Sequence, residues 1–138
     1  MTYKYFEHKA DIGIIGLGNS LEEAFQEAAK AMFKVMANIN KIEPKKEIKI
    51  NLESTDKKEL FISWLNELLA QRDIKEMLFS KFKVNIEKSE NKYILKSKVF
   101  GEKINKKHEL ETEVKAATYS QLDFKEGKKV RIQCIIDV

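Results

Sequence analysis

The sequence predicts an α+β domain, in which two helices cover one face of a mostly antiparallel or mixed sheet of six or seven strands, a two-layer α/β sandwich. Two observations predict this class. Apolar residues recur at helical spacing in two stretches, within residues 21–37 and 60–69. Most other apolar residues alternate with polar ones, as in strands with one buried face. The length of 138 residues is that of one domain, so we expect a single domain over residues 1–138.

The first 37 residues predict two strands followed by a helix. Residues 2–8 have the aromatic and β-branched content of an opening strand, and residues 11–18 predict a second, short one. Ser20 and Glu23 have the spacing of a capping box, which begins a helix over residues 21–37. The glycines of "GIIGLGNS" match neither a P-loop nor a dinucleotide-binding loop, so we interpret them as a turn between strand and helix.

The remainder of the chain predicts one more helix and several strands. Asp56 and Glu59 resemble a second capping signal, ahead of an apolar stripe that places Trp64 in the core. Cys134 alternates with apolar residues and is expected to face the core too. The predicted strands are, in order, residues 46–53, a hairpin around 82–86 and 93–99, residues 110–118 and residues 128–138.

The composition indicates a globular domain with a heavily charged surface. The 26 basic and 22 acidic residues give a net charge of +4, which raises the question of nucleic-acid binding. Arg72 and Arg131 are the only arginines, and acidic residues are interspersed with the lysines, so a solvated Lys/Glu surface is favoured. The sequence lacks an apolar run of membrane-spanning length and a secretory signal, and its single cysteine suits a reducing cytoplasm.

Two aspartates far apart in the sequence are candidates for a cation site. Asp11 lies between the first two predicted strands, and Asp137 precedes the main-chain carboxylate of Val138. If the first and last strands lie close together, three carboxylates meet, and oxygen ligands of this charge suit a hard cation such as calcium or magnesium. The alternative is that both aspartates are solvated surface groups, and sequence spacing does not decide between the two.

Three other polar residues are weaker candidates. His8 and His108 are the only histidines, and each suits a metal ligand, a general base or a structural residue. Lys115 shares a predicted strand face with three glutamates, so it either pairs across the sheet or guides a phosphate or a partner. No nucleophile, base and oxyanion-binding pair can be assembled, so the residues alone support an α+β domain with an acidic cation site.

Four separated motifs resemble the archease family, in order from about residue 5 to residue 138. They are "HKADIGI" with the following "SLEEAFQEAAKAMFKVM", then "FISWLNELLA", "HELETEVKAATYSQL" and the terminal "IIDV". The resemblance implies a small two-layer α/β protein that is not itself a catalyst. It implies a protein cofactor of the RtcB-type tRNA-splicing ligase, which promotes guanylylation of the ligase by GTP with a divalent metal and so allows multiple turnover.

The resemblance also implies which residues act. The family's metal site, usually described as calcium-binding, corresponds here to Asp11, Asp137 and Val138. Magnesium or manganese are the other candidate cofactors. His8, His108 and Lys115 match family motif positions, and Lys115 is the one expected to contribute to activation. The expected partner is the ligase, in the cytoplasm, with indirect contact to tRNA and GTP.

Two hypotheses from other classes compete with this one. The first is a basic RNA-binding or chaperone module that acts without a metal site, and the low arginine content argues against it. The second is a hydrolase built on the acidic residues, for which the sequence offers no evident nucleophile.

Overall fold

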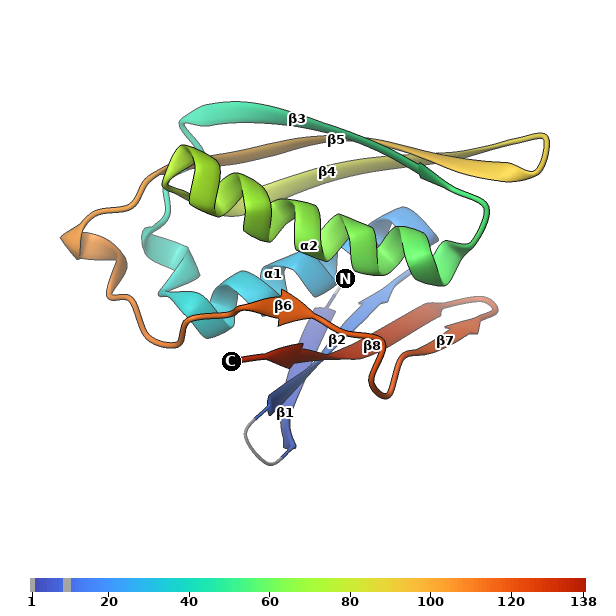
Figure 1. Cartoon of the computed structure of the whole chain (residues 1–138), viewed down its shortest axis with the longest axis horizontal. Helices are drawn as coiled ribbons and strands as arrows, with labels where there is room; N and C mark the ends of the chain where they lie inside the picture. Colours follow the sequence, from blue (N-terminus) through green and yellow to red (C-terminus); the bar gives the residue numbers. More distant parts are fainter. Residues whose placement is uncertain (1, 9–10) are drawn as a thin grey trace.

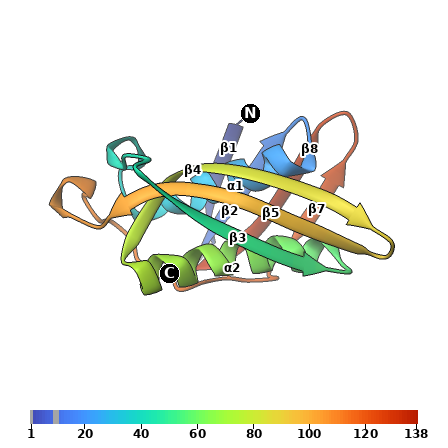
Figure 2. The same ribbon diagram turned by 90° about the horizontal axis from the view of Figure 1, so that it is seen from above.

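The two helices lie between two antiparallel sheets, so the molecule has three layers (Figures 1 and 2). The computed structural model describes residues 2–8 and 11–138, with side chains described for residues 2–4 and 11–138. The elements, in chain order, are β1 (Thr2–His8), β2 (Asp11–Gly18), α1 (Leu21–Met36), the 3-10 turn η1 (Ile39–Lys41), β3 (Lys46–Ser54), α2 (Lys57–Lys75), β4 (Met77–Ser89), β5 (Lys92–Lys103), the 3-10 turn η2 (Lys106–His108), β6 (Ala116–Ala117), β7 (Asp123–Glu126) and β8 (Val130–Asp137). Within these residues, no helix has the length and apolar character needed to cross a membrane.

The α+β class is confirmed, but the expected single sheet is divided in two. The larger sheet has the order β1-β2-β8-β6, with β7 also paired to β8, and the smaller has the order β3-β5-β4. Helix α1 contacts β2 and β8 of the larger sheet and β4 of the smaller one. Because it is covered from both sides, ten of its 16 residues are buried. The helices therefore cover one face of each sheet, rather than one face of a single sheet.

The glycines ahead of α1 serve helix packing rather than a turn. All three lie within β2, and the connection to the helix consists of Asn19 and Ser20. Ser20 is the N-cap, as expected, because its Oγ accepts a hydrogen bond from the Glu23 N–H at 3.1 Å. A Cβ at Gly16 would lie 2.2 Å from the Ala24 carbonyl oxygen. The interpretation of these glycines as a turn was therefore wrong, since Gly16 lets the helix backbone approach the strand.

We expect Gly16→Ala to lower the free energy of unfolding by about 3 kcal/mol or more, at the upper end of overpacking substitutions. The added methyl group would meet helix backbone, which cannot move aside as a flexible side chain would. Urea denaturation measures the loss. Gly127→Ala is the matched control, because a Cβ there meets nothing within 4 Å. Equal stability of the two variants would contradict the close approach of α1 and β2.

The core contains the two residues that the sequence placed there. Trp64 is fully buried, and its indole N–H donates a hydrogen bond to the Phe25 carbonyl oxygen at 3.1 Å. This bond satisfies the one polar group that the ring takes out of water. Cys134 is also fully buried, and the loss of hydration raises the pKa of its thiol to about 12. Both predictions are confirmed.

The segment before β6 is not the strand that alternation predicted over residues 110–118. Only Ala116–Ala117 pairs as a strand. The Glu111 N–H donates instead to the Met36 carbonyl oxygen at 2.8 Å, at the end of α1. Further along, Arg72 Nη1 donates to the Val114 carbonyl oxygen at 2.9 Å. The segment follows the helix end because the last carbonyls of a helix lack partners within it.

Candidate functional site: the paired strand ends that hold Asp11 and Asp137

Asp11 and Asp137 occupy neighbouring positions at the same end of the larger sheet. Strands β2 and β8 are antiparallel, and Ile12 lies opposite Ile136. Asp11 precedes Ile12 as the first residue of β2, and Asp137 follows Ile136 as the last residue of β8. Asp137 is exposed and Asp11 is partly exposed. Facing residues of an antiparallel pair have Cβ atoms about 5 Å apart, so the two positions suit carboxylates that share one cation.

Val138, the residue expected to supply a main-chain carboxylate, lies beside these two. Its side chain is half-buried and packs against the core, which fixes the position of its main-chain carboxylate next to Asp137. Among the described side chains, no group of three or more His, Cys, Asp or Glu residues is arranged so that it could hold a metal ion. A cation here would therefore depend on two side-chain carboxylates and one main-chain carboxylate. This all-oxygen set fits a hard cation, and Cys134 is buried in the core with its thiol protonated.

Lys115 and His8 lie at the same end of the sheet. The Lys115 N–H donates to the Asp137 carbonyl oxygen at 2.8 Å, and the next residue, Ala116, faces Asp137 in the β6–β8 pair. The Lys115 side chain is exposed. On the other side of β2, His8 faces Asp11 in the β1–β2 pair, while its side chain lies outside the described residues. Two of the three weaker candidates thus join the strand ends.

His108 belongs to a different part of the molecule. It is fully buried in η2, where its Nδ1 accepts a hydrogen bond from the Asn105 N–H at 3.0 Å. The proton is therefore on Nε2, which donates to the Glu102 carboxylate at 2.8 Å. Both ring nitrogens are occupied by contacts away from the strand ends that carry Asp11 and Asp137. These contacts favour a structural histidine over a metal ligand.

The Glu102 carboxylate is the centre of this buried network. It accepts hydrogen bonds from the Glu43 N–H at 2.8 Å and from His108, and Lys107 Nζ lies 3.0 Å away. The Glu43 N–H, followed by His108 and Lys107, stabilises the ionised form and lowers the pKa of Glu102 from 4.5 to about 2. The carboxylate therefore anchors η2, and the segment that follows η1, to β5.

The lowered pKa of Glu102 predicts a defined loss of stability in acid. A carboxyl group that is more acidic in the folded than in the unfolded chain stabilises the fold above its unfolded pKa. We expect this contribution to disappear as the pH falls from 4.5 toward 2. Denaturant unfolding across this range should show a shallower pH dependence for Glu102→Gln than for wild type. The exposed turn residue Glu90 supplies the control Glu90→Gln, and an unchanged slope in Glu102→Gln would contradict the network.

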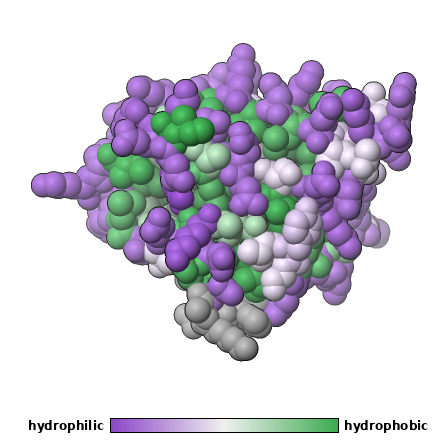
Figure 3. Space-filling model, in the orientation of Figure 1, coloured by the Kyte–Doolittle hydropathy of each residue, from purple (hydrophilic) through white to green (hydrophobic). Residues whose placement is uncertain are grey.

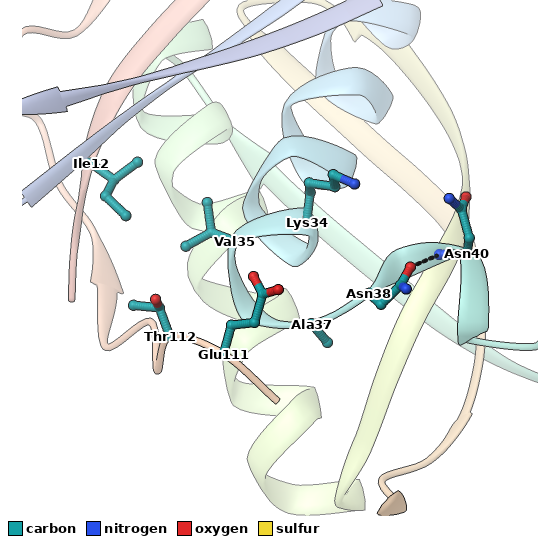
Figure 4. Close-up of a pocket in the computed structure, with 8 residues that line it drawn as sticks. All are labelled: Ile12, Lys34, Val35, Ala37, Asn38, Asn40, Glu111 and Thr112. Atoms are coloured by element: carbon teal, nitrogen blue, oxygen red, sulfur yellow. Dashed lines mark hydrogen bonds between the residues drawn. The ribbon is translucent and has the colours of Figure 1, made fainter. Parts of the chain in front are cut away.

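A cleft that sequence reasoning missed opens beside the strand ends. It has a volume of about 470 Å³ and is lined by Ile12, Lys34, Val35, Ala37, Asn38, Asn40, Glu111 and Thr112 (Figure 4). The Glu111 carboxylate points into it, and Ile12 follows Asp11 directly. The cleft forms because the segment after η2 bends against the end of α1. The alternation of residues 110–118, taken as a strand, gave no signal of it.

Together, the fold and the strand-end carboxylates define a small α+β protein with an acidic, partly exposed sheet edge. The sequence matches the family described as "Archease protein family (MTH1598/TM1083)" over residues 3–138. The chain therefore belongs to the archease family.

Relatives and a solved structure agree with this assignment over most of the chain. The protein archease of Pyrococcus furiosus is 49% identical over 121 residues, which cover 87% of this chain and 85% of the relative. The protein archease of Sulfurisphaera tokodaii is 40% identical over 138 residues, covering 99% and 98%. The solution structure of Methanobacterium thermoautotrophicum protein 1598 superposes with a TM-score of 0.87 at 36% identity, covering 99% of this chain and 98% of that one.

Proposed function

We propose that this protein activates an RtcB-type tRNA-splicing ligase through a divalent-cation site formed by Asp11, Asp137 and the main-chain carboxylate of Val138. The observation that carries the proposal is the register of β2 and β8, which sets the two aspartates side by side. Membership of the archease family supports the ligase as the partner. In this role the protein is a cofactor of another enzyme and promotes its guanylylation by GTP.

The donor set supports calcium as the cation, with magnesium or manganese as alternatives. Carboxylates at the open end of a sheet leave room for the water and partner oxygens that calcium takes in addition to protein ligands. When bound, the cation would supply positive charge, either to the phosphates of GTP or to the surface that docks on the ligase. Asp137 is exposed, so both roles are sterically open to it.

Lys115 is the residue that we assign to the contact with phosphate or with an acidic group of the ligase. Its backbone is held against Asp137, while its side chain is exposed and forms no ion pair with any described residue. A fixed stem with a solvated ammonium group suits the recognition of phosphate as a point charge. His8 is the second residue at this end of the sheet, and His108 is assigned to the support of η2.

The rate of ligase guanylylation tests the proposal. The cognate ligase would be mixed with labelled GTP and divalent metal, with and without this protein, and the covalent ligase–GMP adduct followed over time. The proposal expects faster adduct formation when the protein is present. Equal rates, with a ligase shown to be active, would contradict it.

A further inference from the structure

The outer face of the smaller sheet carries a dense group of lysines, here called the lysine face. Lys49 lies opposite Lys98, and Lys98 lies opposite Lys83, so one lysine from each strand forms a single row across β3, β5 and β4. Lys81 and Lys96 flank this row along the strands, and all five side chains are exposed. Figure 3 shows hydrophilic side chains projecting along the upper edge of the molecule, where Figure 1 places this sheet.

The lysines of the row form no ion pair with a described residue, although the exposed Glu47 lies in the adjacent row, opposite Phe100. Of the ion pairs between described residues, none involves any of the five lysines, although Lys92 pairs with Glu53 at one end of the same sheet. Like charges directly opposite one another in a sheet destabilise it. The arrangement therefore costs folding stability, and it produces a positive potential over this face of the sheet. A surface of this kind favours binding of an anion that extends over several positions.

The groups around the row suit a nucleic-acid strand better than an acidic protein surface. Phe100 is half-buried in the same face, and the ammonium groups of Lys81 and Lys83 lie 5.3 and 5.7 Å from its ring centre. An aromatic ring among cations offers a stacking surface for an unpaired base. The exposed amides of Asn51 and Asn85 face Lys96 from either side and add neutral hydrogen-bonding groups.

The dimensions of the lysine face match a short piece of such a strand. Neighbouring strands lie about 4.8 Å apart, so a row across three strands spans roughly 10 Å. Lys49, Lys83, Lys96 and Lys98 also line a surface hollow of about 400 Å³. Glu47 bounds the positive region at one side, and Glu53 and Glu87, one row beyond Lys96, bound it at the other. Lysines contact phosphates as point charges and read little sequence, so this surface suits the backbone of a few nucleotides.

We propose that the lysine face binds single-stranded RNA through its phosphate backbone. The helix layer separates this face from the larger sheet that carries Asp11 and Asp137 (Figure 1). One side of the protein can therefore hold an RNA strand while the strand-end site faces a protein partner. This binding activity is additional to the proposed activation of the ligase.

Fluorescence anisotropy with a labelled single-stranded RNA oligonucleotide tests the proposal. The test variant carries Lys49→Gln, Lys83→Gln and Lys98→Gln. The control variant carries Lys58→Gln, Lys106→Gln and Lys128→Gln, which remove the same charge from exposed lysines elsewhere. For each phosphate that a protein neutralises, the logarithm of its affinity for a single strand falls by about 0.7 per tenfold rise in salt concentration. We expect the test variant to bind RNA about tenfold more weakly or worse than wild type. The slope of log affinity against log salt concentration should become shallower by about 2. The control variant should bind as wild type does.

Two measurements keep the result interpretable. The test variant is expected to fold and to melt at or above the wild-type temperature, because it removes like-charge repulsion. A polyglutamate competitor distinguishes an acidic protein partner from RNA. The proposal would be overturned if both variants bound RNA equally weakly, or if the wild-type protein bound no RNA at low salt. It would also be overturned if the protein bound polyglutamate through the lysine row and did not bind RNA.

Discussion

Replacing Asp11 or Asp137 by asparagine is expected to return ligase guanylylation to the rate seen without this protein. Asparagine keeps the size of the side chain but removes the negative charge on which a calcium site depends. Even partners outside the first ligand sphere of a metal are worth about 10–100-fold in affinity or activity, so a direct ligand should be worth at least as much. The measurement is the rate of ligase–GMP formation with each variant in place of wild type.

Asp123→Asn provides the matched control for this experiment. Asp123 begins β7 of the same sheet, where it faces Gln133 and forms an ion pair with Arg131 at 3.9 Å, away from Asp11 and Asp137. This variant should stimulate guanylylation as wild type does. Circular dichroism establishes that all three variants are folded. Full stimulation by folded Asp11→Asn and Asp137→Asn would show that the strand-end carboxylates have no part in activation.

Calcium is expected to raise the melting temperature of the protein by about 10 °C when added at a hundredfold excess over its dissociation constant. A ligand that binds only the folded chain adds about 2.7 kcal/mol under these conditions. For a domain of this size each kcal/mol corresponds to a few degrees. Thermal unfolding with and without calcium measures this effect in the absence of any ligase. Magnesium and manganese, added in the same way, rank the candidate cations.

The Asp137→Asn variant should lose this calcium shift and yet be no less stable than wild type without metal. Carboxylates at one end of a sheet repel one another. Removing one charge relieves part of that repulsion. Asp123→Asn should keep the full shift. If none of the three cations changed the melting temperature of the wild-type protein, a metal site at these residues would be contradicted.

The helices and the hairpin could be predicted because their signals are local. Ser20 and Asp56 each accept a hydrogen bond from the helix that follows, as the capping patterns indicated. The strands of the hairpin follow their alternation. The two-residue turn at Glu90 closes the hairpin, with Glu90 at a φ of 57°, in the left-handed region. What alternation could not show is which strands pair. The division into two sheets depends on contacts between distant segments.

Residues 110–118 were mispredicted for a related reason. Alternation indicates which side chains can be buried, but it does not indicate which groups form hydrogen bonds with the backbone. Here the end of α1 supplies that partner through the Met36 carbonyl oxygen, and Arg72 supplies another. The cleft lined by Glu111 follows from the same contact.

The residues of the candidate site could be predicted from the sequence, but their proximity in the fold could not. Asp11 and Asp137 stand at the two ends of the sequence, and only the pairing of Ile12 with Ile136 brings them together. The lysine face was missed because its members, from Lys49 to Lys98, are separated in sequence by a helix and a turn. Their interspersion with glutamates along the chain suggested a neutralised surface, whereas the register gathers the lysines in one row.

Multiple-turnover RNA ligation by the cognate ligase, with GTP and divalent metal, tests the central claim most directly. The number of ligated products per ligase molecule would be measured with and without this protein, and a single-turnover reaction would confirm that the ligase is active. Activation through guanylylation predicts that product rises from about one per ligase to many when the protein is added. Product that stays at about one per ligase, with an active ligase, would contradict the proposed function.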